Sequence, residues 1–303
     1  MATLIGTADG VHWVGSDQPP VLAGHRVDGL ARGHSSWWVL TDGDGVWNIP
    51  DGGTPSRVAG SDGTRLNCML ARSDDVLLGA EAAQLFHIPA SGEPGAEPTA
   101  DDAFQDAPGR SEWFTPWGGP PDVRSLAEDT DGTVYLNVHV GGVLRYRGDD
   151  PVWRDTMDIH ADVHEVIAHP ELAGTALAAT ARGLAVSRDG AEHWDFRTDG
   201  LHARYCRAVA VSGDRVYVSA SRSNRGENAA VYRSNLEGVG LERCEAGLPD
   251  WFSANVNTGC LQANGDQVVI GDADGTVFGS VDSGHKWSVV ADGLPAVRCV
   301  AIG

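Results

Sequence analysis

The chain consists of short runs of alternating apolar and polar residues that are separated by glycine-rich turns. Val, Ile, Leu, Tyr and Trp recur with a period of two, and the 39 glycines lie between these runs. A period of two places successive side chains on opposite faces of a strand, and long helical periodicity is absent. The pattern therefore predicts an all-β protein with many short strands joined by tight turns.

One short segment recurs seven times. It reads apolar, variable, small, Leu or Val, Ala, and its clearest copies are VRSLA at 123–127, CRAVA at 206–210 and VRCVA at 297–301. Looser copies are VDGLA (27–31), NCMLA (67–71), HEVIA (164–168) and TGCLQ (258–262). Repeats of roughly 40 to 45 residues with four strands each are typical of propeller blades. We therefore expect this segment to form the inner strand of each of seven blades.

Both ends of the chain are expected to share one blade. Residues from about 296 to 303 supply a single inner strand, and residues from about 1 to 22 read like the second and third strands of other blades. Pairing these ends would remove the exposed sheet edges of an open ring. The prediction is a single domain, residues 1–303, that forms a closed seven-bladed β-propeller. Insertions are expected at about 89–110, between a third and a fourth strand, and at 221–228, where other blades have a tight hairpin.

Two segments match a short motif of known propellers. The segment 280–287 has the full form S-x-D-x-G-x-x-W. The segment 187–194 has the same form, except that its glycine is one position earlier, at Gly190. The residues are Ser280, Asp282, Gly284 and Trp287 in the first, and Ser187, Asp189 and Trp194 in the second. They resemble the Asp-boxes of the BNR-repeat propellers, a WD40/YVTN-like superfamily that includes sialidase-like, sortilin-type and photosystem-assembly-factor proteins. The resemblance covers the whole chain and implies the propeller fold. It also implies that these Ser and Asp side chains accept backbone N–H bonds within a turn above the Trp ring.

Composition excludes some partners. There are 42 acidic and 22 basic residues, and the formal net charge is -20. Such a charge opposes nucleic-acid backbones and anionic membrane surfaces, so we expect neither partner. No run of about 18 apolar residues occurs, and the N-terminal sequence has no signal-peptide pattern, which favours a cytoplasmic protein. The oligomeric state is left open.

The second position of the recurring segment is expected to face the central channel. Around the ring it reads Arg298, Asp28, Cys68, Arg124, Glu165, Arg207 and Gly259. One interpretation is a set of ion pairs that fix neighbouring blades, Arg298 with Asp28 and Glu165 with Arg124 and Arg207. The other is a net positive throat, because three guanidiniums face two carboxylates and can hold a carboxylate or phosphate ligand in bidentate fashion.

A second candidate site is the rim formed by the loops before each inner strand and between second and third strands. Rings and cations in this region can stack on planar ligands and orient polar groups. The residues are His160, His164, His202, Arg204, Tyr205, Trp251 and Phe252, with Arg222, Arg225 and Glu227 from the 221–228 loop. In the alternative interpretation, Trp251 and Phe252 pack between blades and the histidines are solvated.

Three functions remain open. The preferred one is a non-catalytic propeller that binds a protein partner or a small, possibly anionic, ligand on its rim and channel. The alternative is a glycosidase- or lyase-type enzyme with Glu165 or Glu227 as acid or base. A classical sialidase is disfavoured because its arginine-containing start motif is missing and because sialidase propellers commonly have six blades. The third function is an assembly factor. No cofactor is expected, since nucleotide and hydrolase motifs are missing, and no metal site, since the histidines lack an obvious ligand pattern.

Overall fold

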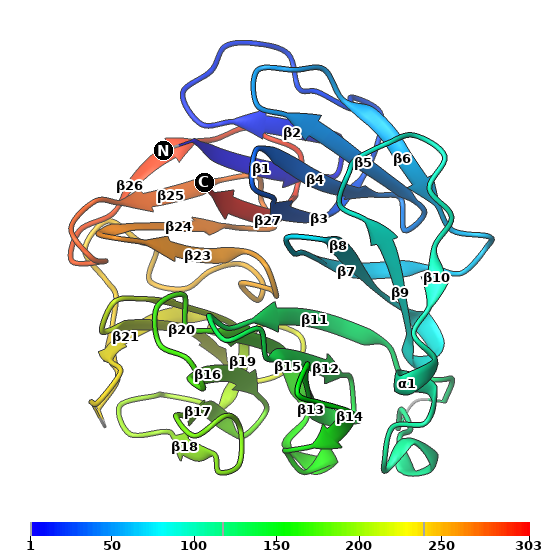
Figure 1. Ribbon diagram of the computed structural model, residues 1–303. Helices are drawn as coiled ribbons and strands as arrows, with labels where there is room; N and C mark the ends of the chain where they lie inside the picture. Colours follow the sequence, from blue (N-terminus) through cyan, green and yellow to red (C-terminus); the bar gives the residue numbers. More distant parts are fainter. Residues whose placement is uncertain (1, 117, 239) are drawn as a thin grey trace.

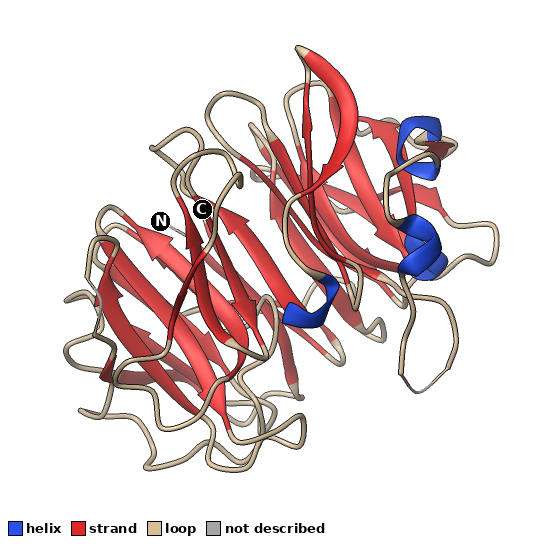
Figure 2. Ribbon diagram, turned by 90° about the horizontal axis from the view of Figure 1, so that it is seen from below, coloured by secondary structure: helices blue, strands red, loops and turns tan. Residues whose placement is uncertain are grey.

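The computed structural model describes residues 2–116, 118–238 and 240–303, which form seven antiparallel sheets around a central axis (Figure 1). Strands make up nearly all of the regular structure (Figure 2). The helices of the described residues are single turns, and none is long and apolar enough to cross a membrane. They are η1 (Glu81–Ala83), α1 (Asp102–Gln105), η2 (Arg110–Glu112) and η3 (Ile159–Ala161).

Each sheet is a blade whose strands run from the axis outward in chain order. The inner strands contact one another around the ring; they are β3 (Val27–Arg32), β7 (Leu66–Ala71), β11 (Val123–Glu128), β15 (Val163–Ala168), β19 (Tyr205–Ser212), β23 (Leu261–Asn264) and β27 (Val297–Ile302). The second strands are β1 (Thr3–Thr7), β4 (Ser36–Thr41), β8 (Asp75–Ala80), β12 (Val134–Val138), β16 (Ala176–Thr180), β20 (Arg215–Ser221) and β24 (Gln267–Gly271).

The outer part of each blade completes the sheet. The third strands are β2 (Gly10–Trp13), β5 (Gly45–Pro50), β9 (Gln84–Pro89), β13 (Gly142–Arg147), β17 (Gly183–Ser187), β21 (Ala230–Asn235) and β25 (Val277–Ser280). The fourth strands are β6 (Ser56–Gly60), β10 (Thr99–Ala100), β14 (Asp150–Asp155), β18 (Asp195–Arg197), β22 (Glu242–Arg243) and β26 (Ser288–Ala291). The prediction of a seven-bladed β-propeller is confirmed.

The two ends of the chain close the ring, as expected. β1 pairs with β27 from Thr3 opposite Ile302 to Thr7 opposite Val297, and β2 pairs with the other edge of β1. Within the described residues this sheet has three strands, and an isolated bridge from Val11 to Val21 lies at its outer edge. The termini lie side by side in Figure 1. The ring is therefore held shut by backbone hydrogen bonds between residues at opposite ends of the sequence.

The two long loops differ in how they relate to their blades. Residues 90–98 lie between the third strand β9 and the fourth strand β10, as expected, but the rest of the segment 89–110 contains β10 itself and α1, so the expected insertion is too long at its C-terminal end. Two exposed residues form β10, and so short a strand leaves almost no periodic pattern. The loop 222–229 lies between β20 and β21, the second and third strands of its blade.

The core lies between neighbouring blades and on both faces of each sheet. Leu177 and Ala178 are adjacent in β16, and both are fully buried. Leu177 packs with Cys206 and Val218 of the following blade, whereas Ala178 packs with Tyr135 of the preceding blade. Strands buried on both faces have nearly continuous apolar runs, so their polar positions do not define the strand register.

The inner strands contain a β-bulge where they begin. The register of β11 against β12 shifts by one residue between Val123 and Ser125, and that of β15 against β16 shifts between Val163 and Glu165. The bulged residue is Arg124 in the first case and His164 in the second. His164, and not Glu165, is thus the structural counterpart of Arg124, and β7 likewise has Asn67 in place of Cys68. The register assumed for these two repeats is wrong by one residue.

Candidate functional site

The central channel is a cavity of about 490 Å³ that is lined by residues of all seven inner-strand segments. Polar side chains from neighbouring blades meet there because six of the seven inner strands have a shift in pairing register near the residue that lines the channel. The lining includes the residues expected from the recurring segment, Arg298, Asp28, Cys68, Arg124, Glu165, Arg207 and Gly259. The register error does not remove Glu165 and Cys68 from the channel, but it changes which atoms they contact.

One of the expected ion pairs is present. Arg298 Nη2 lies 2.9 Å from Asp28 Oδ1, and Arg26 binds the same carboxylate through Nε at 2.9 Å and Nη2 at 3.0 Å. The Asp28 side chain is only 8% exposed, and the two guanidiniums that neutralise its charge are half-buried. Among the described residues that line the channel, Arg298 is therefore the one arginine with an ion pair to a carboxylate of the neighbouring blade.

The expected pair of Glu165 with Arg124 is wrong. Glu165 Oε2 accepts a hydrogen bond from the backbone N–H of Val209 at 2.9 Å, and its Oε1 accepts one from Gly259 at 2.8 Å. Ser125, its counterpart in the preceding blade, accepts the N–H of Val166 in the same way. Both residues occupy the position after the bulge and join their inner strand to the next one. Glu165 thus holds three consecutive inner-strand segments together.

Burial governs the ionisation of Glu165. Its side chain is almost fully enclosed, and this desolvation raises its pKa to about 8, although the two backbone N–H donors favour the charged form. The raised pKa favours the protonated form of Glu165 at neutral pH. Glu165 adds little negative charge to the channel, and its two oxygens are already engaged with backbone.

Arg124 and Arg207 face the channel without matched carboxylates. The nearest acidic partner of Arg124 is Asp122, with 4.0 Å between Nη2 and Oδ2. Arg207 donates from Nη1 to the Tyr205 hydroxyl at 3.2 Å, while its buried Nε has no hydrogen-bond partner in the described part of the chain. Burial lowers the pKa of Arg124, and the neighbouring Arg207 lowers it further. This part of the channel therefore holds two guanidiniums and a local excess of positive charge.

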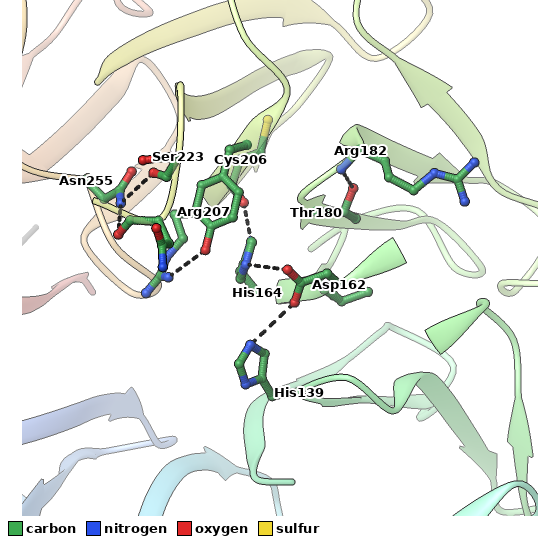
Figure 3. A network of polar contacts seen from close by, with 12 residues as sticks. His139, Asp162, His164, Thr180, Arg182, Cys206, Arg207, Ser223 and Asn255 are labelled. Atoms are coloured by element: carbon green, nitrogen blue, oxygen red, sulfur yellow. Dashed lines mark hydrogen bonds and ion pairs between the residues drawn. The ribbon is translucent and has the colours of Figure 1, made fainter. Parts of the chain in front are cut away.

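A group of side chains that the sequence analysis missed lies beside these arginines. His139 comes from the turn between β12 and β13, and Asp162 precedes β15 directly. His139 Nε2 lies 3.4 Å from Asp162 Oδ1, and His164 Nε2 lies 3.6 Å from Asp162 Oδ2 (Figure 3). The two imidazoles, His139 foremost, hold the pKa of Asp162 well below its ordinary value. His139 lies in a loop between second and third strands, and Asp162 lies in a loop before an inner strand. Loops in these two positions share one rim, so the place of each residue in its repeat could have indicated that the two are close.

His164 is not a rim residue as expected. It is 1% exposed, and its Nδ1 lies 2.6 Å from the carbonyl oxygen of Cys206 on the neighbouring blade. Its ring centroid is 4.6 Å from that of Tyr205, which connects the histidine to Arg207. Burial lowers the pKa of His164, although Asp162 acts in the opposite direction. The residue is thus buried between two neighbouring inner strands, next to the channel residue Glu165.

The remaining rim candidates separate into exposed and buried groups. Trp251 is 39% exposed, its ring lies 5.0 Å from that of His202, and Arg243 stacks over it at 4.0 Å. Phe252 is only 5% exposed and packs edge-on against Phe278 in the core, so its expected place on the rim is wrong. Phe252 instead packs between blades, as the alternative interpretation of the rim residues predicted.

Most of the other predicted rim side chains are exposed loop residues. The loop 222–229 is fixed by Asn255, whose Nδ2 donates to the carbonyl oxygen of Asn224 at 3.1 Å, and by a hydrogen bond from Ser223 to Glu227. Glu227 is not among the residues that line the channel with Glu165. The exposed residues are His160, Arg204, Arg222, Arg225 and Glu227.

The two motif turns have internal hydrogen bonds. Asp282 Oδ1 accepts the backbone N–H of Lys286 at 2.9 Å and the Ser280 hydroxyl at 2.8 Å, and the Trp287 ring above them is 3% exposed. In the second turn the Asp189 carboxylate accepts from the N–H of His193 at 3.0 Å, and Ser187 Oγ accepts from Ala191 at 2.9 Å. These polar groups are used within their own turns, which lie between third and fourth strands.

The fold defines the protein as a seven-bladed β-propeller of four-stranded repeats, and comparison with known proteins agrees. No family model and no curated protein matches the chain. Solved structures with the fold include the WD40 β-propeller domain of Doa1, 15% identical with a TM-score of 0.63 over 100% of this chain and 87% of that one. The RRP9 WD40 repeats are 15% identical, with a TM-score of 0.63 over 97% and 86% of the two chains.

A glycoside-hydrolase structure is equally similar in shape. The Niastella koreensis GH74 enzyme is 12% identical, with a TM-score of 0.64 over 94% of this chain and 46% of that enzyme. At such identities the likeness concerns the fold alone, because WD40 proteins and an enzyme match equally well. The chain is thus placed among the β-propeller repeat proteins, and its function has to be argued from its own residues.

Proposed function

We propose that this protein is a non-catalytic propeller that binds a small anion, a carboxylate or a phosphate, between Arg124 and Arg207 in the central channel. The observation that carries the proposal is the excess of guanidinium groups there. Arg298 is paired with Asp28, whereas Arg207 has no carboxylate within ion-pair distance among the described residues, and Arg124 only approaches Asp122. A bidentate anion would satisfy both guanidiniums.

The overall negative charge does not oppose such a site. At physiological ionic strength the interaction of exposed charges is largely screened beyond about 8 Å, whereas charges in a partly enclosed channel are screened less. Among the 42 acidic residues, those that line the channel in the described part of the chain are Asp28, Asp122 and Glu165. The protonated state of Glu165 at neutral pH further reduces negative charge near the arginines. An anion in the channel would respond mainly to Arg124 and Arg207.

The enzymatic alternative has less support. Both oxygens of Glu165 accept backbone N–H bonds, an arrangement suited to fixing strands rather than to transferring a proton to a substrate. Glu227 lies on a loop outside the channel lining. A glycosidase or lyase with this pair as acid and base stays a hypothesis. The hydrogen-bonded turns at Ser187 and Ser280 support, as a finer proposal, membership of the BNR/Asp-box propellers.

A thermal-shift measurement tests the proposal. Citrate and inorganic phosphate are added to wild-type protein, Arg207→Ala and the control Arg154→Ala, whose guanidinium pairs with Asp150 on an outer strand. A ligand at a hundred times its dissociation constant stabilises the folded state by about 2.7 kcal/mol, so we expect the melting temperature of wild type and control to rise by several degrees. Arg207→Ala should lose this shift. Equal shifts in the three proteins would contradict an anion site at Arg207.

A further inference from the structure

His139, Asp162 and His164 bring three metal-ligating atoms together near the start of β15. The ligand atoms of the three residues all lie within 4.8 Å of one another. They come from two neighbouring blades: His139 from the turn after β12, and Asp162 and His164 from the beginning of β15. Figure 3 shows the Asp162 carboxylate between the two imidazoles. Two histidines and one carboxylate form a ligand set used by zinc and by non-haem iron.

The tautomer of His164 orients a lone pair toward this group. Its Nδ1 lies 2.6 Å from the Cys206 carbonyl oxygen, which can only accept, so Nδ1 carries the hydrogen. In the neutral ring Nε2 is then unprotonated, and it faces the Asp162 carboxylate oxygen at 3.6 Å. A hydrogen bond from the far ring nitrogen to a carbonyl is the usual support of a metal-bound histidine. Nε2 itself is buried and has no hydrogen-bond partner in the described residues.

His164 Nε2 is buried and faces the oxygen of a partly exposed carboxylate, an arrangement of two acceptors that is stabilised by a proton or a metal cation between them. The distances of 3.4 Å and 3.6 Å from the Asp162 oxygens to the two Nε2 atoms are close to the separation of neighbouring ligands around an ion with bonds of about 2.0–2.2 Å. We infer that His139, Asp162 and His164 bind one divalent transition-metal ion of the zinc type. Three protein ligands leave a coordination position for water or for an anion.

The backbone around the group is held in an uncommon conformation. Val140, next to His139, has φ of 56°, and Asp162 has φ of 51°, both in the left-handed region. A β-branched residue such as Val140 rarely adopts such a φ, whereas Asp tolerates it. The fold therefore holds the turn that carries His139 against a local energetic preference. Asn tolerates the left-handed region as Asp does, so Asp162→Asn removes the charge without new backbone strain.

Cobalt binding tests the inference. Protein treated with EDTA and dialysed is titrated with Co²⁺, whose visible absorption reports imidazole and carboxylate coordination, and bound Co²⁺ is then displaced with Zn²⁺. We expect one Co²⁺ per chain for wild type and for the control His160→Gln, an exposed histidine of the neighbouring turn. Asp162→Asn should bind at least about a hundredfold more weakly, because even outer-shell partners are worth roughly 10- to 100-fold.

A second variant protects the test against misfolding. His139→Gln changes a turn residue outside the inner strands, and its circular dichroism is compared with that of wild type. Loss of the Co²⁺ spectrum in a folded His139→Gln supports the site. An unchanged spectrum in both variants, or no spectral change in wild type, overturns it. The inference goes beyond the anion site, since its ligands are different residues, and a negative result leaves anion binding to the arginines untouched.

Discussion

Replacing Glu165 should expose its role as a link between blades. Glu165→Ala leaves the backbone N–H groups of Val209 and Gly259 buried without acceptors. Each unsatisfied buried donor costs about 1–3 kcal/mol, so the free energy of unfolding should fall by about 2–6 kcal/mol. A change of 1 kcal/mol moves the melting temperature by about 2–4 °C in a protein of 150–250 residues. The variant should therefore melt at least about 5 °C below wild type.

The pH dependence of Glu165→Gln gives an independent readout. The pKa of Glu165 is about 8 in the folded state, above the ordinary value of 4.5, so the folded protein holds a proton that the unfolded chain releases between these values. Stability contributed by this group is full below pH 4.5 and is lost as the pH rises toward 8, at up to about 1.36 kcal/mol per pH unit. Gln resembles the protonated side chain and cannot ionise, so it lacks this loss.

Urea unfolding at pH 5, 6.5 and 8 measures both effects. Because other titrating groups are common to wild type and Glu165→Gln, they cancel in the difference between the two free energies of unfolding. Because the amide nitrogen of Gln cannot accept from the second backbone N–H, we expect Glu165→Gln to be less stable than wild type at pH 5 by about 1–3 kcal/mol. Between pH 5 and pH 8 the difference should then shift in favour of the Gln variant by on the order of 3 kcal/mol. A difference that does not change with pH would refute the raised pKa. A cost below about 1 kcal/mol for Glu165→Ala would refute the link between strands.

Other substitutions test the placement of residues and the closure of the ring. Phe252→Ala should cost about 3–5 kcal/mol in thermal or urea unfolding because the ring is buried in the core; a loss below 1 kcal/mol would place it on the surface. Trp251→Ala, which truncates a partly exposed ring, should cost much less. Deletion of residues 297–303 removes β27 and exposes an edge of β1, so size-exclusion chromatography should show aggregated or unfolded protein. A monomeric, folded truncation product would contradict the closure.

The fold could be predicted from the sequence because each blade repeats one pattern. The recurring segment identified seven inner strands, and the incomplete last copy indicated that the ends pair. The register of individual strands could not be predicted with the same accuracy. In β7 and β15 an apolar residue occurs one position after the true anchor, and no residue of either strand is fully exposed, so a shift of one residue leaves the pattern almost unchanged.

The candidate site could be predicted only in part. The channel residues followed from their common position in the repeat, and the pair of Arg298 with Asp28 followed from the alternation of charges. The contact of His139 with Asp162 depends on two loops of neighbouring blades that converge at the rim, and no local pattern reports it. Phe252 illustrates the opposite error, since an aromatic residue in a linking segment can face either the rim or the core.

The most direct test of anion binding is a calorimetric titration of citrate into wild type, Arg124→Ala, Arg207→Ala and the double variant in metal-free buffer. A hydrogen bond to a charged group contributes about 1.5–3 kcal/mol, so each single variant should bind at least about tenfold more weakly. The double variant should bind more weakly than either single one, and a departure of its loss from the sum of the two single losses measures the coupling of the two arginines through the same anion. Wild-type affinity in both single variants, or no citrate binding by wild type, would contradict an anion site between Arg124 and Arg207.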